Sequence, residues 1–234
     1  VWEPKNVDRS HRGSMTLKHA FARSVNSIHG PLADSVGWEK VIDYAYNAGI
    51  TTELERVPAV CLGSSDVSLY EIVNAYCTFI NEGLYEAPKI VTRIEDKDGN
   101  VIFEAKSEPK QKINIETAFL VTELLRAGLT EPGGTTQGLF EYDIFRFNTD
   151  FGGKTGTSSD YTDGWFIGVI PGLVAGCWTG NDDRTIHFTT SHTGEGLRTA
   201  LPVYGRFIEK VLKDNNLKQY RQRFPKPDFK ISKP

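Results

Sequence analysis

Apolar residues recur at helical spacing in five stretches of the chain, and these stretches carry signals for where a helix begins or ends. The spacing predicts helices over residues 14–24, 38–47, 69–80, 115–126 and 200–213. The third is the clearest, because Ser68 and Glu71 have the spacing of a capping box and Gly83 provides a stop. We expect its buried stripe to consist of Leu69, Ile72, Val73, Tyr76, Phe79 and Ile80.

Single residues define the ends of three other helices. Thr16 and Asn114 are suited to cap the first and fourth helices, and Gly49 is suited to end the second. On the first helix, the residues that fall on one face are Leu17, Ala20, Phe21 and Ser24. Ser24 is therefore expected to close this face at the end of the helix.

Short apolar runs flanked by turn residues predict strands. Residues 90–94 and 101–103 flank Asp98-Gly99 and predict one hairpin. Residues 165–170 and 173–179 flank Pro171-Gly172 and predict another. Together with a strand over residues 152–157, the second hairpin gives three successive antiparallel strands, which we expect at the heart of a sheet.

Composition adds few constraints. The 234 residues, with a net charge of −3, are ordinary for a soluble globular protein and give no reason to expect nucleic acid as a partner. No apolar run is long enough to span a bilayer. The chain begins with Val1-Trp2-Glu3-Pro4, which is neither a signal peptide nor the context of an initiator methionine, so we expect the chain to be a piece of a longer protein. The three cysteines lie among apolar residues, which favours free thiols over a disulfide framework.

Two segments are expected to be poorly packed. Residues 128–138 are rich in Gly and Thr and are predicted to form a mobile loop. Residues 214–234 form a basic tail, expected to be extended and solvated, with an anionic partner as an alternative. The basic residues of this tail are Lys218, Arg221, Arg223, Lys226, Lys230 and Lys233.

The strongest chemical signal is the strand Gly152 to Thr157, which is suited to receive an acyl substrate along its edge. Lys154 can attract a carboxylate and hold a neighbouring hydroxyl ready to pass a proton. Thr155 and Thr157 present hydroxyls on the same side of an extended strand. Gly156 lets another backbone approach closely, and the Thr157 N–H could then point at an oxyanion.

These residues have simpler interpretations. A phosphate loop would need a glycine at position 148, where the chain has Asn148, and a helix after Gly156, where the pattern predicts turn and strand. An ordinary Gly-rich turn remains open. Ser24-Val25-Asn26 alone is a weak motif, and a polar pair that ends a helix is the simpler interpretation.

Neither a metal nor a cofactor is expected. Asp182, Asp183 and His187 could suggest a metal site, but they lie in a strand-to-loop region without ligand spacing. The acidic residues at 95–98 are most simply a solvated turn, with calcium as a formal alternative.

Several motifs occur in an order that resembles a known family. They are Trp2-Glu3-Pro4-Lys5-Asn6, the segment Gly13 to Asn26, Leu62-Gly63-Ser64 with Val67-Ser68-Leu69, Ala75-Tyr76 with Asn81-Glu82-Gly83, and Gly153 to Thr157 with Asp163-Gly164-Trp165-Phe166. Residues 1–213 resemble the C-terminal part of the transpeptidase domain of class A penicillin-binding proteins. The resemblance implies an α/β (α+β) fold with a central antiparallel sheet flanked by helices, incomplete at its N-terminal side, followed by the tail 214–234.

The resemblance also implies roles for single residues. Ser24 would relay a proton between the nucleophile and Lys154, and Asn26 would bind an amide of the substrate. Lys154, Thr155 and Thr157 would bind the substrate carboxylate, and the Thr157 N–H would form half of an oxyanion hole beside Gly156. The implied reaction is attack on the D-alanyl-D-alanine amide of a peptidoglycan stem peptide, then transfer to an amine, with β-lactams as inhibitors.

One signature of the family is missing. The nucleophile is expected in a Ser-x-x-Lys motif some tens of residues before Ser24, and the string Ser107-Glu108-Pro109-Lys110 is a chance match, because its proline and its place after a hairpin exclude a helix start. We therefore expect the chain alone to be inactive. An apolar groove would be filled by the missing N-terminal segment or a second chain.

Alternatives to the transpeptidase interpretation remain. A β-lactamase or D,D-carboxypeptidase could use the same architecture, although the spacing around Leu62-Gly63-Ser64 argues against it. A non-catalytic penicillin-binding or scaffold fragment is the other alternative. In the family, the domain lies outside the cytoplasmic membrane, in the periplasm, on an N-terminal anchor, and the resemblance implies the same location.

Overall fold

The computed structural model describes residues 4–7, 10, 11 and 13–231. Its helices are α1 Leu17–Ala22, α2 Asn26–Val36, α3 Trp38–Ala48, α4 Leu69–Ile80, α5 Ile115–Thr130, α6 Ser191–Gly194 and α7 Ala200–Lys213. Its strands are β1 Leu84–Tyr85, β2 Arg93–Glu95, β3 Val101–Glu104, β4 Lys110–Gln111, β5 Gly152–Thr157, β6 Asp163–Ile170 and β7 Leu173–Gly180. Short 3₁₀ turns are η1 Pro58–Leu62, η2 Gln137–Glu141, η3 Ser159–Tyr161 and η4 Asn215–Tyr220.

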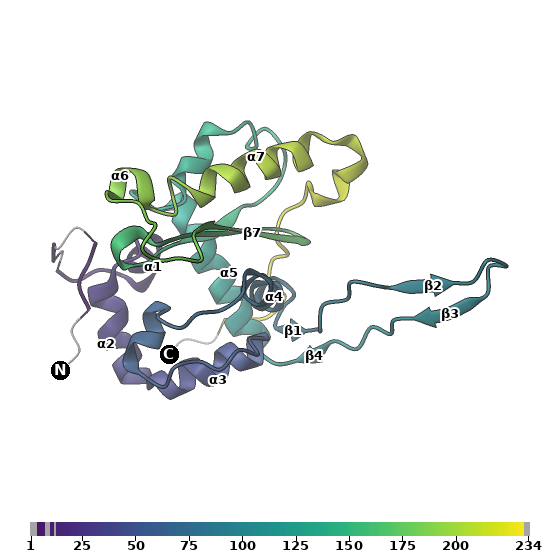
Figure 1. Cartoon of the computed structure of the whole chain (residues 1–234), viewed down its shortest axis with the longest axis horizontal. Helices are drawn as coiled ribbons and strands as arrows, with labels where there is room; N and C mark the ends of the chain where they lie inside the picture. Colours follow the sequence, from purple (N-terminus) through teal and green to yellow (C-terminus); the bar gives the residue numbers. More distant parts are fainter. Residues whose placement is uncertain (1–3, 8–9, 12, 232–234) are drawn as a thin grey trace.

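The centre of the molecule is a three-stranded antiparallel sheet in the order β5-β6-β7. Helix α7 covers one face, where Tyr204 packs against Phe166 with ring centroids 4.9 Å apart. Helix α4 covers the other, where a Cβ on Gly176 would meet the side chains of Leu69 and Val73 at 2.7 Å. Figure 1 shows the sheet between these helices, so the predicted sheet with helices on both faces is confirmed.

The strongest local signals are confirmed. Ser68 and Glu71 form the capping box of α4, and Gly49 ends α3 in the left-handed conformation. The predicted apolar stripe of α4 is only half-buried, however, and the most deeply buried residues of α4 are Glu71, Ala75 and Thr78. This difference arises because α4 packs against α3, α5 and the sheet, so burial is not confined to one stripe.

The first helix is shorter than predicted. Thr16 caps α1 as expected, but α1 ends at Ala22, and Leu17 on the predicted inner face is 44% exposed. Ser24 therefore lies outside the helix, and α2 starts two residues later. The sequence prediction missed α2 because Pro31 lies inside it, and a proline is unfavourable in a helix interior.

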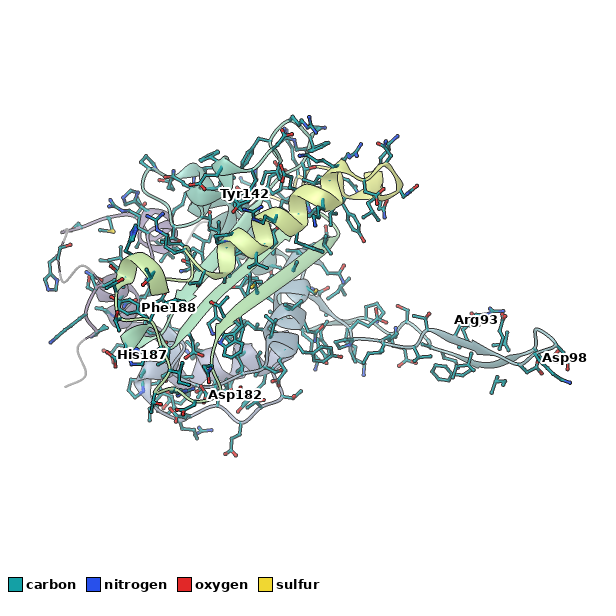
Figure 2. All side chains as sticks on the ribbon, turned by 45° about the horizontal axis from the view of Figure 1, so that its top comes forward. Arg93, Asp98, Tyr142, Asp182, His187 and Phe188 are labelled. Atoms are coloured by element: carbon teal, nitrogen blue, oxygen red, sulfur yellow. The ribbon has the colours of Figure 1, made fainter. Side chains whose placement is uncertain are left out.

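The expected hairpin forms an arm that extends away from the body (Figure 1). Figure 2 shows Arg93 and Asp98 along this arm, far from the sheet. The Asp96 carboxylate accepts hydrogen bonds from the N–H groups of Asp98 and Asn100, which closes the turn. Strand β2 begins at Arg93 and not at Ile90, which is 91% exposed.

The basic tail is not simply solvated. It starts after α7, which ends at Lys213 as predicted, but Arg223 forms an ion pair with Asp150, and Phe229 packs edge-on against Phe119 with centroids 6.3 Å apart. The expectation of a solvated tail is therefore wrong for this part, because aromatic residues in the tail find apolar partners on α5. Lys233, and Trp2 and Glu3 of the first motif, lie outside the described residues.

Within the part of the chain that the structure describes, no helix is long and apolar enough to cross a membrane. Among the same residues, no group of His, Cys, Asp and Glu side chains is arranged to hold a metal ion. Asp182 and His187 lie on the exposed segment 181–190 (Figure 2). The cysteines are half-buried free thiols.

Candidate active site

Lys154 lies in the middle of β5, the edge strand of the central sheet. It is paired with Ile167 of β6, whereas Thr155 is paired with Phe166 and Thr157 with Gly164. Successive residues of a strand face opposite sides, so Thr155 and Thr157 share one face, as expected, and Lys154 projects from the other. The predicted substrate-binding side chains of β5 therefore lie on both faces of this edge strand, with Lys154 on one face and the two threonines on the other.

Ser24 lies in the short connection between α1 and α2, with φ at +54°. This left-handed conformation costs a non-glycine residue about 1–3 kcal/mol and must be maintained by its surroundings. The Ser24 N–H donates to the Phe21 carbonyl at 3.1 Å, and the Val25 N–H donates to the Ala20 carbonyl at 2.9 Å. The backbone thus fixes the direction of the Ser24 side chain.

The Lys154 ammonium donates a hydrogen bond to Ser24 Oγ at 2.8 Å, although 130 positions separate the two residues. It also donates to the Thr155 carbonyl at 3.0 Å and lies 5.9 Å from the centre of the Phe21 ring. Burial lowers the pKa of Lys154 to about 8. A lysine with such a pKa exchanges protons near neutral pH and can use the Ser24 hydroxyl as a relay.

Asn26 is the first residue of α2 and lies two positions from Ser24. Its side-chain amide donates to the Lys5 carbonyl at 2.9 Å. The neighbouring Asn6 carboxamide oxygen accepts from the Ser27 N–H at 3.0 Å, so the start of the described chain is tied to the start of α2. The structure thus joins Ser24 to Lys154 directly, while the side-chain amide of Asn26 donates its hydrogen bond to another residue of the chain.

The hydroxyls of Thr155 and Thr157 also have partners within the protein. Thr155 donates to Thr135 Oγ1 at 2.9 Å, and Thr157 Oγ1 accepts from the Gly196 N–H at 3.0 Å. The Thr157 hydroxyl still has its own proton to donate. A Cβ at Gly156 would lie 3.0 Å from the Cβ of Trp165, so packing on β6 favours a glycine at this position.

The sequence did not predict Thr135 as a site residue, because Thr135 belongs to the loop 128–138, which was expected to be mobile. The structure contradicts that expectation. The Thr135 N–H donates to the Ala22 carbonyl, the Thr136 N–H donates to the Gly128 carbonyl, and both Gly134 and Thr136 are buried. A loop packed in this way places Thr135 at β5, and nothing in its local sequence could have indicated the contact.

Two further residues of the Lys154 surroundings were also missed. Phe21 was predicted only as part of an apolar face, but its ring lies near both Lys154 and His29, whose ring centre is 6.1 Å from that of Phe21. Burial lowers the pKa of His29, a hydrogen bond to the Val25 carbonyl opposes this, and the charge of Lys154 lowers it further. His29 is therefore expected to be neutral at neutral pH.

The turn between β5 and β6 lies next to Thr157 and is rigidly hydrogen-bonded. The Asp163 carboxylate accepts from the Trp178 ring N–H at 2.9 Å and from the Thr162 hydroxyl at 2.8 Å. Burial alone would raise the pKa of Asp163, but the hydrogen bonds with Trp178, Thr162 and Ser158, together with the charge of Arg184, outweigh it and lower the pKa. Within the turn, Asp160 and Tyr161 both have a positive φ, a strain typical of functional sites.

Comparison with known proteins gives a family match over most of the chain. Residues 1–174 match the family model described as the penicillin binding protein transpeptidase domain. The matched range contains the predicted site residues Ser24, Asn26 and Lys154 to Thr157.

Curated relatives agree with this match. The chain is 31% identical over 232 residues to penicillin-binding protein 1A of Rickettsia typhi, a match that covers 91% of this chain and 29% of the relative. It is 32% identical over 211 residues to penicillin-binding protein 1B of Haemophilus influenzae, covering 90% of this chain and 26% of the relative. The chain thus spans less than a third of the length of these relatives.

Solved structures show the same fold. Penicillin-binding protein 1A from Haemophilus influenzae superposes with a TM-score of 0.82 at 23% identity, covering 100% of this chain and 38% of that one. The PonA1 protein from Mycobacterium tuberculosis, in complex with penicillin V, gives a TM-score of 0.78 at 22% identity, covering 98% and 65%.

Proposed function

The chain belongs to the penicillin-binding protein transpeptidase family, and from this premise we propose that it forms part of a peptidoglycan D,D-transpeptidase. The single observation that carries the proposal is the hydrogen bond from Lys154 to Ser24, because it joins the two sequence motifs across 130 positions. A stem peptide ending in D-alanyl-D-alanine is the proposed donor, and β-lactams are the proposed inhibitors.

In the proposed reaction, Lys154 and Ser24 pass a proton to the leaving group. A serine nucleophile passes its hydroxyl proton to the lysine of its own Ser-x-x-Lys motif and attacks the carbonyl carbon of the donor amide. The C–N bond then breaks, the departing nitrogen takes a proton from the Ser24 hydroxyl, and Lys154 returns a proton to Ser24. Ser24 Oγ already accepts a hydrogen bond from Lys154, so its own proton is available to donate. An acceptor amine then attacks the acyl-enzyme and releases the cross-linked product.

We assign substrate binding to β5 and Asn26, with Lys154 serving in both roles. Lys154 supplies the charge that attracts the substrate carboxylate, and the hydroxyls of Thr155 and Thr157 extend the binding site along β5. The Thr157 N–H is the proposed donor to the oxyanion, and Gly156 leaves room for the substrate backbone. Asn26 is proposed to bind a substrate amide, for which its hydrogen bond to Lys5 must be exchanged.

We propose that the nucleophile comes from a segment of polypeptide outside these 234 residues, either of the same protein or of a second chain. The Ser-x-x-Lys string at Ser107 is a poor candidate, because Lys110 lies in β4 at the base of the arm and not in a helix. Apolar side chains exposed on α2 support an additional covering segment, since Leu32 is 40% and Val36 is 45% exposed.

The proposed location is the outer face of the cytoplasmic membrane, the periplasm in a bacterium with two membranes. Its support is the proposed substrate, because peptidoglycan cross-linking takes place outside the cytoplasm. We propose residues 1–213 as the transpeptidase part, with residues 214–234 as an appended tail.

Acylation by benzylpenicillin tests the function. Intact-mass analysis is expected to show no stable adduct on the 234-residue chain and one adduct on a domain that also contains a Ser-x-x-Lys segment. An adduct on the 234-residue chain would refute the external nucleophile, and no adduct on the complete domain would refute the function. Product analysis with a labelled amine acceptor then separates transfer from hydrolysis.

A further inference from the structure

The tail that follows α7 returns to the body next to the strand that carries Lys154. Residues 221–229, which we call the strap, run beside residues 148–150, immediately before β5. The Asp150 N–H donates to the Gln222 carbonyl at 3.2 Å, and Arg223 Nε donates to Asn148 Oδ1 at 2.9 Å. The strap is therefore joined by main-chain and side-chain contacts to the segment that leads into β5.

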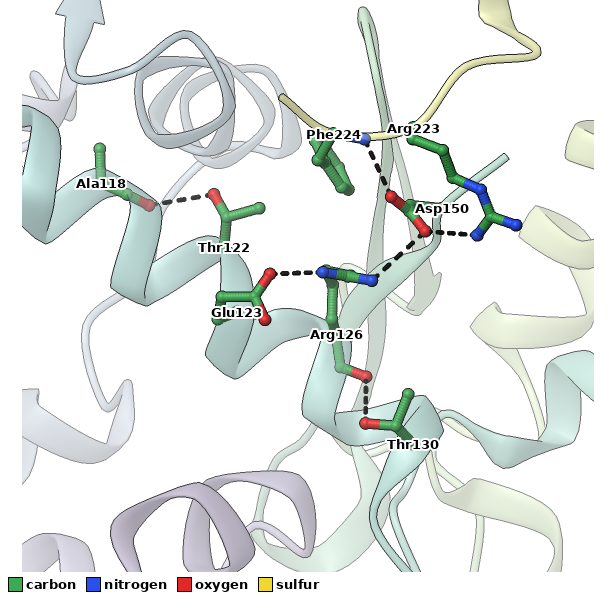
Figure 3. Close-up of polar contacts among 8 residues, drawn as sticks. All are labelled: Ala118, Thr122, Glu123, Arg126, Thr130, Asp150, Arg223 and Phe224. Atoms are coloured by element: carbon green, nitrogen blue, oxygen red, sulfur yellow. Dashed lines mark hydrogen bonds and ion pairs between the residues drawn. The ribbon is translucent and has the colours of Figure 1, made fainter. Parts of the chain in front are cut away.

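Asp150 is the centre of these contacts, and its side chain is only 8% exposed. It accepts from Arg223 Nη1 at 2.7 Å and from the Phe224 N–H at 2.9 Å, both in the strap. It also accepts from Arg126 Nη2 of α5 at 3.3 Å. Figure 3 shows the carboxylate between these groups, with Arg126 paired to Glu123 on its other side. One buried carboxylate thus links α5, the strap and the start of β5.

Strand β5 needs such an anchor because of its own sequence and position. It is an edge strand, so among the described residues β6 is its single neighbour in the sheet. Its first two residues, Gly152 and Gly153, have no side chains that could pack. Glycine is favoured there because a Cβ on Gly152 would lie 3.1 Å from the backbone of α5, and one on Gly153 would lie 2.7 Å from the Phe166 ring. The nearest side chains that can fix the start of β5 are therefore Phe151, which is 4% exposed, and Asp150.

We propose that the strap acts through Asp150 to hold β5 in place, so that Asp150, Arg126 and Arg223 are positioning residues for the contact between Lys154 and Ser24. This inference rests on the proposed function in one respect, because the proposed function is what makes the position of Lys154 important. When the anchor is lost, the start of β5 loosens, water reaches the ammonium more easily, and its hydrogen bond to Ser24 becomes less populated.

The test measures the proton affinity of Lys154 in the 234-residue chain without substrate. Lysine labelled with carbon-13 at Cε gives an NMR signal that titrates with pH, and the Lys154→Arg variant identifies the signal of this residue. Burial places the pKa of Lys154 at about 8 in the intact chain. In Arg223→Met, and in a chain that ends at Tyr220, the midpoint is expected to rise by about 0.5 pH unit or more, a roughly threefold change in proton affinity.

Amide hydrogen exchange in the same samples separates positioning from overall destabilisation. Exchange in β5 is expected to accelerate by about tenfold in both variants, while exchange in α7 and β7 stays unchanged. Lys230→Met is the matched control, because it removes another positive charge from the exposed end of the same tail. Arg223→Lys keeps the charge with a single donor group and should restore part of the wild-type midpoint.

Asp150→Asn distinguishes loosening from simple electrostatics. Losing a nearby negative charge lowers the pKa of a lysine, whereas better access to water raises it. A midpoint that rises in Asp150→Asn supports the proposal, and one that falls overturns it. If Asp150→Asn does not fold, β5 exchange in Arg223→Met and in the truncated chain decides, because losing the positive charge of Arg223 would by itself raise the midpoint. Unchanged β5 exchange in both overturns the proposal. These measurements need neither nucleophile nor β-lactam, so they stay interpretable if the proposed function fails.

Discussion

Glu71 offers a stability test whose size and pH dependence follow from the structure. Its side chain is 8% exposed and accepts six hydrogen bonds. Oε1 accepts from the N–H and hydroxyl of Thr51 and from the N–H of Thr52, at 2.7–2.8 Å. Oε2 accepts from the Thr52 hydroxyl and from the N–H and hydroxyl of Ser68, at 2.8–3.2 Å. The carboxylate therefore ties the 51–52 segment to the start of α4.

Glu71→Gln keeps the shape of the side chain but turns one acceptor into a donor. The hydroxyls of Thr52 and Ser68 can rotate to accept instead, whereas the Ser68 N–H cannot, so at least one backbone N–H loses its partner on the buried Glu71 side chain. Hydrogen bonds to a charged group contribute about 1.5–3 kcal/mol each, and an unsatisfied buried group costs about 1–3 kcal/mol. We expect a loss of about 2–4 kcal/mol in the free energy of unfolding at pH 7.

The effect should depend on pH. The hydrogen bond from the Thr51 hydroxyl is the main cause that lowers the pKa of Glu71; burial opposes it, and further hydrogen bonds from Thr51 and Thr52 add to the lowering. A lowered folded-state pKa adds stability that is complete above the unfolded value of about 4.3 and is lost as the pH falls. The difference between wild type and Glu71→Gln should therefore shrink by about 1 kcal/mol between pH 7 and pH 3.5.

Urea unfolding followed by circular dichroism at both pH values measures this difference. Glu53→Gln is the matched control, because Glu53 lies in the same loop but is exposed, and it should change stability by less than about 0.5 kcal/mol. A Glu71→Gln variant as stable as this control would refute the assigned role of the carboxylate. A difference that stays constant with pH would refute the electrostatic part of the argument.

Three other changes test the sheet and the site. Tyr204→Phe should leave the free energy of unfolding unchanged or raise it by about 1 kcal/mol, because the buried Tyr204 hydroxyl has no hydrogen-bond partner within the described residues. Urea unfolding measures this change, and a loss above about 1 kcal/mol would contradict the expectation. Gly168→Ala should lower stability by about 1–3 kcal/mol, since its Cβ would lie 2.2 Å from the Tyr204 ring, and the double variant Gly168→Ala/Tyr204→Leu should recover part of the loss. In the complete domain, Lys154→Ala should slow acylation by fluorescent penicillin on the order of 100-fold, while the exposed Lys40→Ala should not; equal rates would exclude Lys154 from the mechanism.

Much of the fold could be predicted because its signals are local. The capping box at Ser68, the stop at Gly49 and the strand pattern after Pro171 each depend on residues a few positions apart, and all three are confirmed. The same holds for the same-face placement of Thr155 and Thr157, which follows from the period of an extended strand. Where local signals conflict, as at Pro31 in α2, the prediction failed because packing outweighed propensity.

The sequence by itself determined which residues could do chemistry, since a lysine, two hydroxyls and a glycine on one strand are readable without a fold. Only the tertiary structure decided which of them meet. It joined Lys154 to Ser24, placed Thr135 against Thr155, and returned Arg223 to Asp150 at the start of β5. Contacts between residues so far apart along the chain depend on how whole helices and strands pack, and a local pattern of residues carries no record of that packing.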